Sequence, residues 1–166
     1  RNTAHLLVML FSTFAYELFL GGENKVSDTQ TKAHRSWAKL LDPDELRSNL
    51  VLASIFLTAY EFLSQALVEP LKTFFSDGFD SNRPVLRDEY RAEVLSHHKM
   101  PFFASALWFR NAGALTEQDV ARLQEIRNHR NFIAHNIPAV LGSVDNDVRV
   151  DLLESIDQIV CKIDIW

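Results

Sequence analysis

The part of the chain richest in groups that can handle a phosphate or a proton is residues 125–136, Glu-Ile-Arg-Asn-His-Arg-Asn-Phe-Ile-Ala-His-Asn. An arginine can stabilise the charge that builds on a phosphate during its transfer. A histidine, whose pKa lies near neutral, can give or take a proton. These groups suit RNA cleavage without a metal, in which a base deprotonates a ribose 2′-hydroxyl and its oxygen attacks the adjacent phosphate. In that chemistry we expect His135 to be the base or the acid and Arg130 to hold the phosphate.

The spacing Arg130-Asn131, three further residues and then His135 resembles the Arg-polar-x(3–5)-His signature of the HEPN superfamily, which consists of small all-helical proteins. The resemblance covers the motif helix and the helical layout, and not the whole chain. It implies a metal-independent endoribonuclease that needs no cofactor, with Arg130, His135 and Asn131 as catalytic residues. It further implies a toxin or phage-defence effector that acts on RNA as a homodimer through the motif helix, with an antitoxin protein as a further partner. Some members are inactive, so the alternative is a non-catalytic scaffold that binds a protein partner or a nucleotide.

A helix with about 100° between residues divides the motif into two groups. Arg127, Asn131 and His135 lie on one polar face with Asn128 beside them, and we expect Arg127 and Asn128 to bind substrate. Arg130 falls on the apolar stripe instead. That stripe consists of Leu123, Ile126, Ile133, Ala134 and Ile137. A guanidinium there is costly unless it is paired, and the candidates are a buried carboxylate, a second subunit or a substrate phosphate.

The bulk composition predicts a soluble protein with one helical domain over residues 1–166. Seventeen basic and twenty-two acidic residues give a net charge of −5, which argues against a protein that coats long nucleic acids. A local pocket for one or two phosphates remains compatible with this charge. The single cysteine, Cys161, excludes an internal disulfide and favours a reducing, cytoplasmic location.

Other sites are less well supported by the sequence. His97, His98, His129 and His135 could suggest a metal, but the chain has neither an HExxH motif nor paired cysteines, so we expect no metal site. Cys161 is predicted to lie in the core rather than to act as a nucleophile. Residues 6–20 are apolar but fewer than the roughly 20 that a bilayer requires. We therefore interpret them as part of a core helix rather than a targeting or membrane segment, and expect no membrane partner.

The elements that position the motif are all predicted to be helices, in a bundle of about five or six with antiparallel neighbours. The long helix 43–68 is opened by Asp42-Pro43 and stopped by Pro70. Its Leu46, Leu50, Ala53, Leu57, Tyr60, Ser64 and Leu67 form a predicted heptad seam. Further helices are predicted over residues 3–20, 85–96, 102–112, 117–136 and 148–163. Residues 23–41 are predicted to be a loop with one short amphipathic turn at 34–41, residues 69–86 are predicted to be irregular, and no strand is expected.

The outer face of the long helix is predicted to be a thin polar stripe. Arg47, Ser54, Thr58, Glu61 and Gln65 make up this stripe. Since an amphipathic helix normally carries such a face, we interpret it as a solvated edge. Phe74, Phe75 and Phe79 could stack on bases, but aromatic residues in a loop more often anchor it to the core, and we expect that role here.

Overall fold

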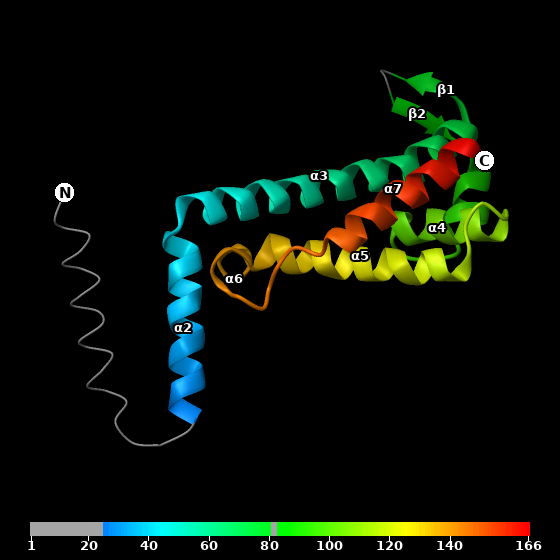
Figure 1. Ribbon diagram of the computed structural model, residues 1–166. Coiled ribbons are helices and arrows are strands. Elements are labelled where there is room, and N and C mark those ends of the chain that lie inside the picture. The colour runs from blue at the N-terminus through cyan, green and yellow to red at the C-terminus, as the bar shows by residue number, and fades with distance from the viewer. Residues whose placement is uncertain (1–24, 81–82) are drawn as a thin grey trace.

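The computed structural model describes residues 25–80 and 83–166, so the predicted helix 3–20 lies outside the described residues. The described chain is a helical bundle with a small β-hairpin at one end (Figure 1). Its elements are α2 (Lys25–Leu41), α3 (Pro43–Phe74), β1 (Ser76–Asp80), β2 (Arg83–Leu86), η1 (Tyr90–Leu95), α4 (Pro101–Asn111), α5 (Glu117–His135), α6 (Ile137–Gly142) and α7 (Val150–Ile165). The predicted all-α class is confirmed.

Helix α3 is the axis of the bundle, with α5 running antiparallel beneath it and α7 crossing between them (Figure 1). Its start is as predicted, because the Asp42 carboxylate accepts hydrogen bonds from the backbone N–H groups of Asp44 and Glu45. Its buried face consists of Ala53, Phe56, Tyr60, Leu63, Leu67, Val68 and Leu71. The predicted seam was therefore partly wrong: Leu50 is exposed, and Phe56 and Leu63 are buried. Apolar residues occur nearly all round this helix, so the sequence alone does not determine which of them face the core.

The prediction that Pro70 ends this helix was wrong, because α3 continues to Phe74. A proline inside a helix removes one hydrogen bond and usually kinks or breaks it. Here Leu71 is buried beyond the proline. The last turn also gains a hydrogen bond from the Thr73 hydroxyl to the Glu69 carbonyl and an ion pair between Lys72 and Glu69. Packing and local polar contacts therefore outweigh the missing bond.

The segment predicted to be irregular contains the hairpin β1–β2, in which Ser76 pairs with Leu86 and Asp80 with Arg83. Gly78 has a φ of 151°, a region that favours glycine. Of the three phenylalanines expected to anchor this segment, only Phe75 is buried. The prediction that no strand is present was therefore wrong. Neither strand has the alternating apolar pattern by which a strand is recognised in a sequence.

Helix α2 occupies most of the segment predicted to be a loop, so that prediction was wrong. It stands across the end of the bundle, against the start of α3 and against α6 (Figure 1). Lys39 donates a hydrogen bond to the Ser143 carbonyl at 3.0 Å, and Lys32 forms an ion pair with Asp145. These partners are about a hundred residues away in the sequence, which is why local pattern did not reveal the helix. The short helix α6 was not predicted either.

The C-terminal helices lie close to the predictions. Helices α4, α5 and α7 each begin and end within two residues of the expected positions. The buried residues Leu152, Ile156, Ile159 and Ile163 all lie on the predicted apolar face of α7. Cys161 is exposed on the same helix, so its predicted core position was wrong. The predicted helix 85–96 is replaced by β2 and the π-helical segment η1.

Helix α3 is also long and apolar enough, by length and composition alone, to cross a membrane. The central helix of a soluble protein passes the same test, so this is weak evidence. Within the apolar 18-residue stretch of this helix, one third (33%) is buried inside the fold. The expectation of no membrane partner stays a prediction.

Two neighbouring residues on α3 give a matched test of this packing. Leu63 is fully buried, whereas the Phe62 side chain is 65% exposed. We expect Leu63→Ala to lower the free energy of unfolding by about 2–5 kcal/mol, because it removes buried contacts and leaves a cavity. Phe62→Ala should change it by less than about 1 kcal/mol. Urea unfolding of both variants measures this, and equal losses would contradict the assignment of the buried face.

Candidate functional site

Helix α5 holds the motif rigidly against the core. A capping box fixes its first turn, because the Thr116 hydroxyl accepts from the Asp119 backbone N–H while the Asp119 carboxylate accepts from the Thr116 N–H. Leu123, Ile126 and Ile133 are fully buried along one side. The predicted apolar stripe is thus confirmed for these three residues, and Ala134 is exposed. The motif residues occupy fixed positions around a well-anchored helix.

Arg130 lies on this apolar side, as the helical spacing predicted, and α3 supplies its surroundings. Its Nη2 donates to the Glu61 carboxylate at 3.0 Å, and its guanidinium carbon lies 5.3 Å from the centre of the Tyr60 ring. Its Nη1 donates to the Asn131 side-chain oxygen at 3.4 Å. An ion pair, a cation–π contact and an amide therefore orient the guanidinium.

This arrangement resolves the question of what pairs with Arg130. The partner is a carboxylate of the same chain, although its side chain is 58% exposed rather than buried. The polar stripe that includes Glu61 is thus more than a solvated edge at this position. The surroundings of Arg130 do not require a second subunit, so the predicted homodimer rests on the HEPN resemblance alone.

The guanidinium nevertheless keeps capacity for another partner. Its Nε is buried and has no hydrogen-bond partner among the described residues, while one third (33%) of the side chain is exposed. A buried unpaired donor is uncommon in folded proteins and calls for an explanation. A ligand oxygen that approaches the exposed part of the side chain could complete its hydrogen bonding.

The other predicted site residues surround Arg130 without all converging on it. The Arg127 guanidinium lies over the Phe103 ring of α4, 5.8 Å from its centre. Asn128 accepts a hydrogen bond from the Gln124 amide on the outer face of α5. His135 is exposed and is the last residue of α5. The structure thus brings Arg130 and Asn131 into contact and leaves Arg127, Asn128 and His135 at separate positions on the same helix.

His135 follows Arg130 by five residues, so their Cα positions differ by about 140° around the axis and about 7.5 Å along it. No hydrogen bond within the described chain joins the two side chains. The protein itself supplies no contact between them. A substrate phosphate would have to bridge the exposed part of Arg130 and the exposed ring of His135.

Three further cations are associated with Tyr60, whose ring contacts Arg130. Lys72 and Lys99 line a cavity together with Tyr60, and the charge of Arg127 acts on the Tyr60 hydroxyl. Of the nearby cations, Arg130 and Lys72 are paired with Glu61 and Glu69. In the part of the chain that the structure describes, neither Arg127 nor Lys99 forms an ion pair. These two unpaired cations give the surface a local positive charge suited to a phosphate.

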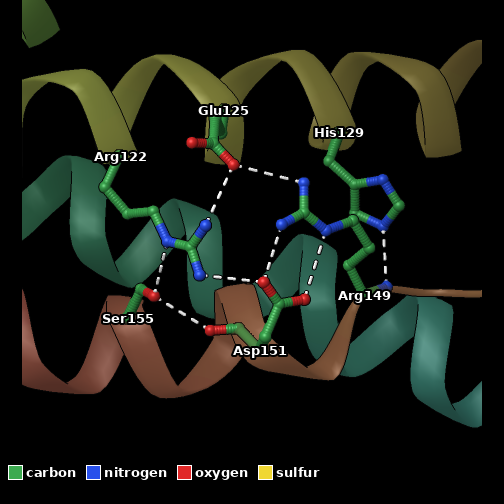
Figure 2. Close-up of polar contacts among 6 residues, drawn as sticks. All are labelled: Arg122, Glu125, His129, Arg149, Asp151 and Ser155. Carbon is green, nitrogen blue, oxygen red and sulfur yellow. Dashed lines mark hydrogen bonds and ion pairs between the residues drawn. The ribbon is translucent and has the colours of Figure 1, made fainter.

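The opposite flank of α5 is attached to α7 by a polar network (Figure 2). Arg122 donates to the Ser155 hydroxyl at 2.9 Å, to Glu125 at 2.9 Å and to Asp151 at 2.8 Å. Arg149 joins the same two carboxylates, at 3.2 Å from Glu125 and 2.6 Å from Asp151. The hydrogen bond from Arg149 lowers the pKa of Asp151. The network fixes α5 against α7 on the side away from Arg127.

His129, a motif residue, belongs to this structural network. Its Nε2 accepts a hydrogen bond from the Arg149 backbone N–H at 3.0 Å (Figure 2). Its ring packs edge-on against Phe56, with 4.9 Å between the ring centres. An accepting nitrogen carries no proton, so the imidazole is neutral in this arrangement. Burial lowers the pKa of His129, and the positive charge of Arg149 lowers it further. His129 is therefore a packing residue that works in its neutral form.

The residues that support the site could hardly be recognised from the sequence. Glu61 was visible only as one member of a polar stripe, and Tyr60 as one member of a seam. Arg149 and Asp151 lie far from the motif in the sequence, so only the fold brings them to α5. In the described ranges, no three histidine, cysteine, aspartate or glutamate side chains gather as a metal site would require.

Comparison with models of known protein families, with curated proteins and with solved structures gives no match to this chain. The HEPN resemblance therefore rests on the motif and the helical layout.

The neutral role of His129 predicts how stability depends on pH. Because its pKa in the folded protein is below the ordinary 6.5, the unfolded chain binds the proton first as the pH falls. The contribution is complete above about pH 6.5 and is lost as the pH falls through the lowered pKa. In His129→Gln, which keeps a hydrogen-bond acceptor, this loss should disappear.

Urea unfolding between pH 7.5 and about pH 5 measures the difference between wild type and variant. His34→Gln on α2 is the matched control, because His34 is an exposed histidine outside the network. The control should retain the pH dependence of the wild type. If the free energy of unfolding depends on pH equally in His129→Gln and in wild type, His129 is not held neutral in the folded protein.

Proposed function

We propose that this protein is a metal-independent endoribonuclease of the HEPN type. The observation that carries the proposal is the state of Arg130. Glu61 and Tyr60 hold its guanidinium on an otherwise apolar helix face, and its buried Nε lacks a partner in the described chain. A protein that maintains an incompletely satisfied arginine beside unpaired cations has a ready partner for a phosphate.

The proposed chemistry assigns one role to each residue. His135, exposed at the end of α5, takes the proton of the ribose 2′-hydroxyl or gives one to the leaving oxygen. Arg130 stabilises the charge on the phosphate, and Asn131, which accepts from Arg130, keeps the guanidinium oriented. Arg127 and Asn128 bind the strand on either side. The products are a 2′,3′-cyclic phosphate and a free 5′-hydroxyl.

The biological setting follows from the resemblance alone. A HEPN ribonuclease with this motif would act as a toxin or phage-defence effector in the cytoplasm, as a homodimer through α5 and under the control of an antitoxin protein. Two motif helices in a shared cleft would offer the His135 of one subunit to the Arg130 of the other. That arrangement would shorten the separation that these residues have within one chain.

A second candidate function is favoured by one contact, the ion pair between Arg130 and Glu61. If its role is structural, the protein is a non-catalytic helical scaffold of HEPN type that binds a protein partner or a nucleotide. In that case Arg130 and Glu61 form a pair that attaches α5 to α3, and His135 has no chemical task.

Cleavage of RNA in the presence of a chelator separates the two candidates. The wild-type protein should give products that end in a cyclic phosphate. His135→Ala should slow cleavage by about 10²–10⁴-fold, the usual contribution of a general acid or base, and Arg130→Ala should slow it by at least about 10²-fold.

His34→Ala is the matched control for His135→Ala, because both histidines are exposed and only His135 belongs to the motif. The control should cleave at the wild-type rate. Full activity in either motif variant would overturn the catalytic assignment. A wild-type protein that is folded and leaves RNA intact would favour the scaffold.

A further inference from the structure

The Glu61 carboxylate occupies the part of Arg130 on which a two-point contact with a phosphate depends. Its Oε1 accepts a hydrogen bond from the Arg130 Nη2 at 3.0 Å. A guanidinium holds an oxyanion through two N–H groups on one edge, either Nε with Nη2 or Nη1 with Nη2. Because Nη2 belongs to both edges, a phosphate that binds Arg130 in this way either displaces Glu61 or lies directly beside it.

Hydrogen-bond geometry limits how far apart the two anions can be when both bind Arg130. An acceptor lies about 3 Å from the nitrogen that donates to it, so two acceptors on Nη2 are at most about 6 Å apart. At that distance two negative charges still repel each other in water. The repulsion increases with the charge of the phosphate. Glu61 therefore acts more strongly against a doubly charged phosphate than against a singly charged one.

The charges around this point leave a single positive charge. Besides the effect of burial, the charges of Arg127, Arg130 and Glu61 act on the Tyr60 hydroxyl, so all three lie around one part of the surface. Two of them are positive and one is negative. An internal phosphodiester carries one negative charge, whereas a terminal phosphate or a free nucleotide carries nearly two above pH 7. The internal phosphodiester is thus the ligand whose charge the site balances.

The contacts around Arg130 hold the arginine in place and leave the carboxylate free to turn away. Its guanidinium lies 5.3 Å from the centre of the Tyr60 ring and 3.4 Å from the Asn131 side-chain oxygen. The Glu61 side chain is 58% exposed and, among the described residues, pairs with no other cation. An exposed ion pair of this kind contributes little stability, so Glu61 can yield to a ligand while Arg130 keeps its position.

We propose that Glu61 is a specificity-determining residue, which restricts the Arg130 site to internal phosphodiesters and disfavours terminal phosphates and free nucleotides. The proposal rests on the proposed function, since it names the class of phosphate that the same site accepts. Attack by a 2′-hydroxyl requires this class, because the reaction has to release the 5′-oxygen of the next nucleotide. Glu61 makes no bond to the reacting atoms and acts through its charge beside Arg130.

Two ligands that differ by one charge test this role in the full chain. At pH 7.5, 2′-O-methyluridine 3′-phosphate carries nearly two negative charges and its methyl diester carries one. Neither can be cut, because the 2′-oxygen is blocked. Titration followed by NMR gives both affinities, and wild type should bind the diester at least as tightly as the monoester. Glu61→Gln keeps an acceptor for Arg130 and removes only the charge. It should shift the ratio of the two affinities toward the monoester by about three- to fivefold.

Glu69→Gln is the matched control, because Glu69 is an exposed glutamate of the same helix that pairs with Lys72 and not with Arg130. It should leave the ratio within about twofold of wild type. Arg130→Ala should weaken binding of both ligands by about tenfold or more, which assigns the binding to this site.

Four results would overturn the proposal: an unchanged ratio in Glu61→Gln, an equal shift in Glu69→Gln, a wild-type preference for the monoester, or no dependence of binding on Arg130. Absence of binding in wild type and in Glu61→Gln alike would overturn it as well.

The outcome is separable from that of the ribonuclease test. A shifted ratio in Glu61→Gln together with a protein that never cuts RNA would support the phosphodiester site and refute the enzyme. Cleavage that needs His135, with the same ratio in wild type and Glu61→Gln, would support the enzyme and refute the role of Glu61.

Discussion

The placement of an arginine on the apolar face of α5 is the constraint around which this structure is organised. A guanidinium in such a position is costly unless opposite charge and hydrogen bonds compensate it. Helix α3 provides both a carboxylate, from Glu61, and an aromatic face, from Tyr60. Both groups come from α3, which packs against α5 and is the longest described helix. The candidate site is therefore a product of the α3–α5 contact rather than of the motif alone.

The remaining elements keep this contact in register. On one side of α5, Arg122 and Arg149 share Glu125 and Asp151 and so attach the helix to α7 (Figure 2). On the other side, Arg127 lies over Phe103 of α4. Exposed ion pairs of this kind contribute little individually, but several that share partners restrict how α5 can rotate. The motif residues that remain exposed are Asn128, on the outer face of α5, and His135, at its C-terminal end.

Local pattern was sufficient for the helices whose ends carry chemical signals. The helix opened by Asp42-Pro43 and the helix predicted from residue 117 both begin where the sequence predicted, and Thr116 with Asp119 caps the second of them. The positions of Arg130 on the apolar side and Arg127 on the polar side also follow from a period of 3.6 residues alone. The fold class and the side of α5 on which Arg130 lies could therefore be predicted.

Contacts between distant residues decided the rest. Helix α2 is held by α3 and α6, and α3 passes Pro70 because Leu71 remains buried. The pairing of Arg130 with Glu61 joins residues 69 positions apart, so the sequence could pose the question of its partner but not answer it. The cavity beside Tyr60 likewise exists only because α3 and the start of α4 meet.

The central claim, that Arg130 and His135 cleave RNA through its own 2′-hydroxyl, is tested most directly on the substrate. A strand of ribonucleotides should be cut in the presence of a chelator, with a cyclic phosphate at the new end. The same strand with a single 2′-deoxynucleotide at the cleavage position should stay intact at that position. Cleavage of the deoxy-substituted bond, or loss of all cleavage in chelator, would contradict the account.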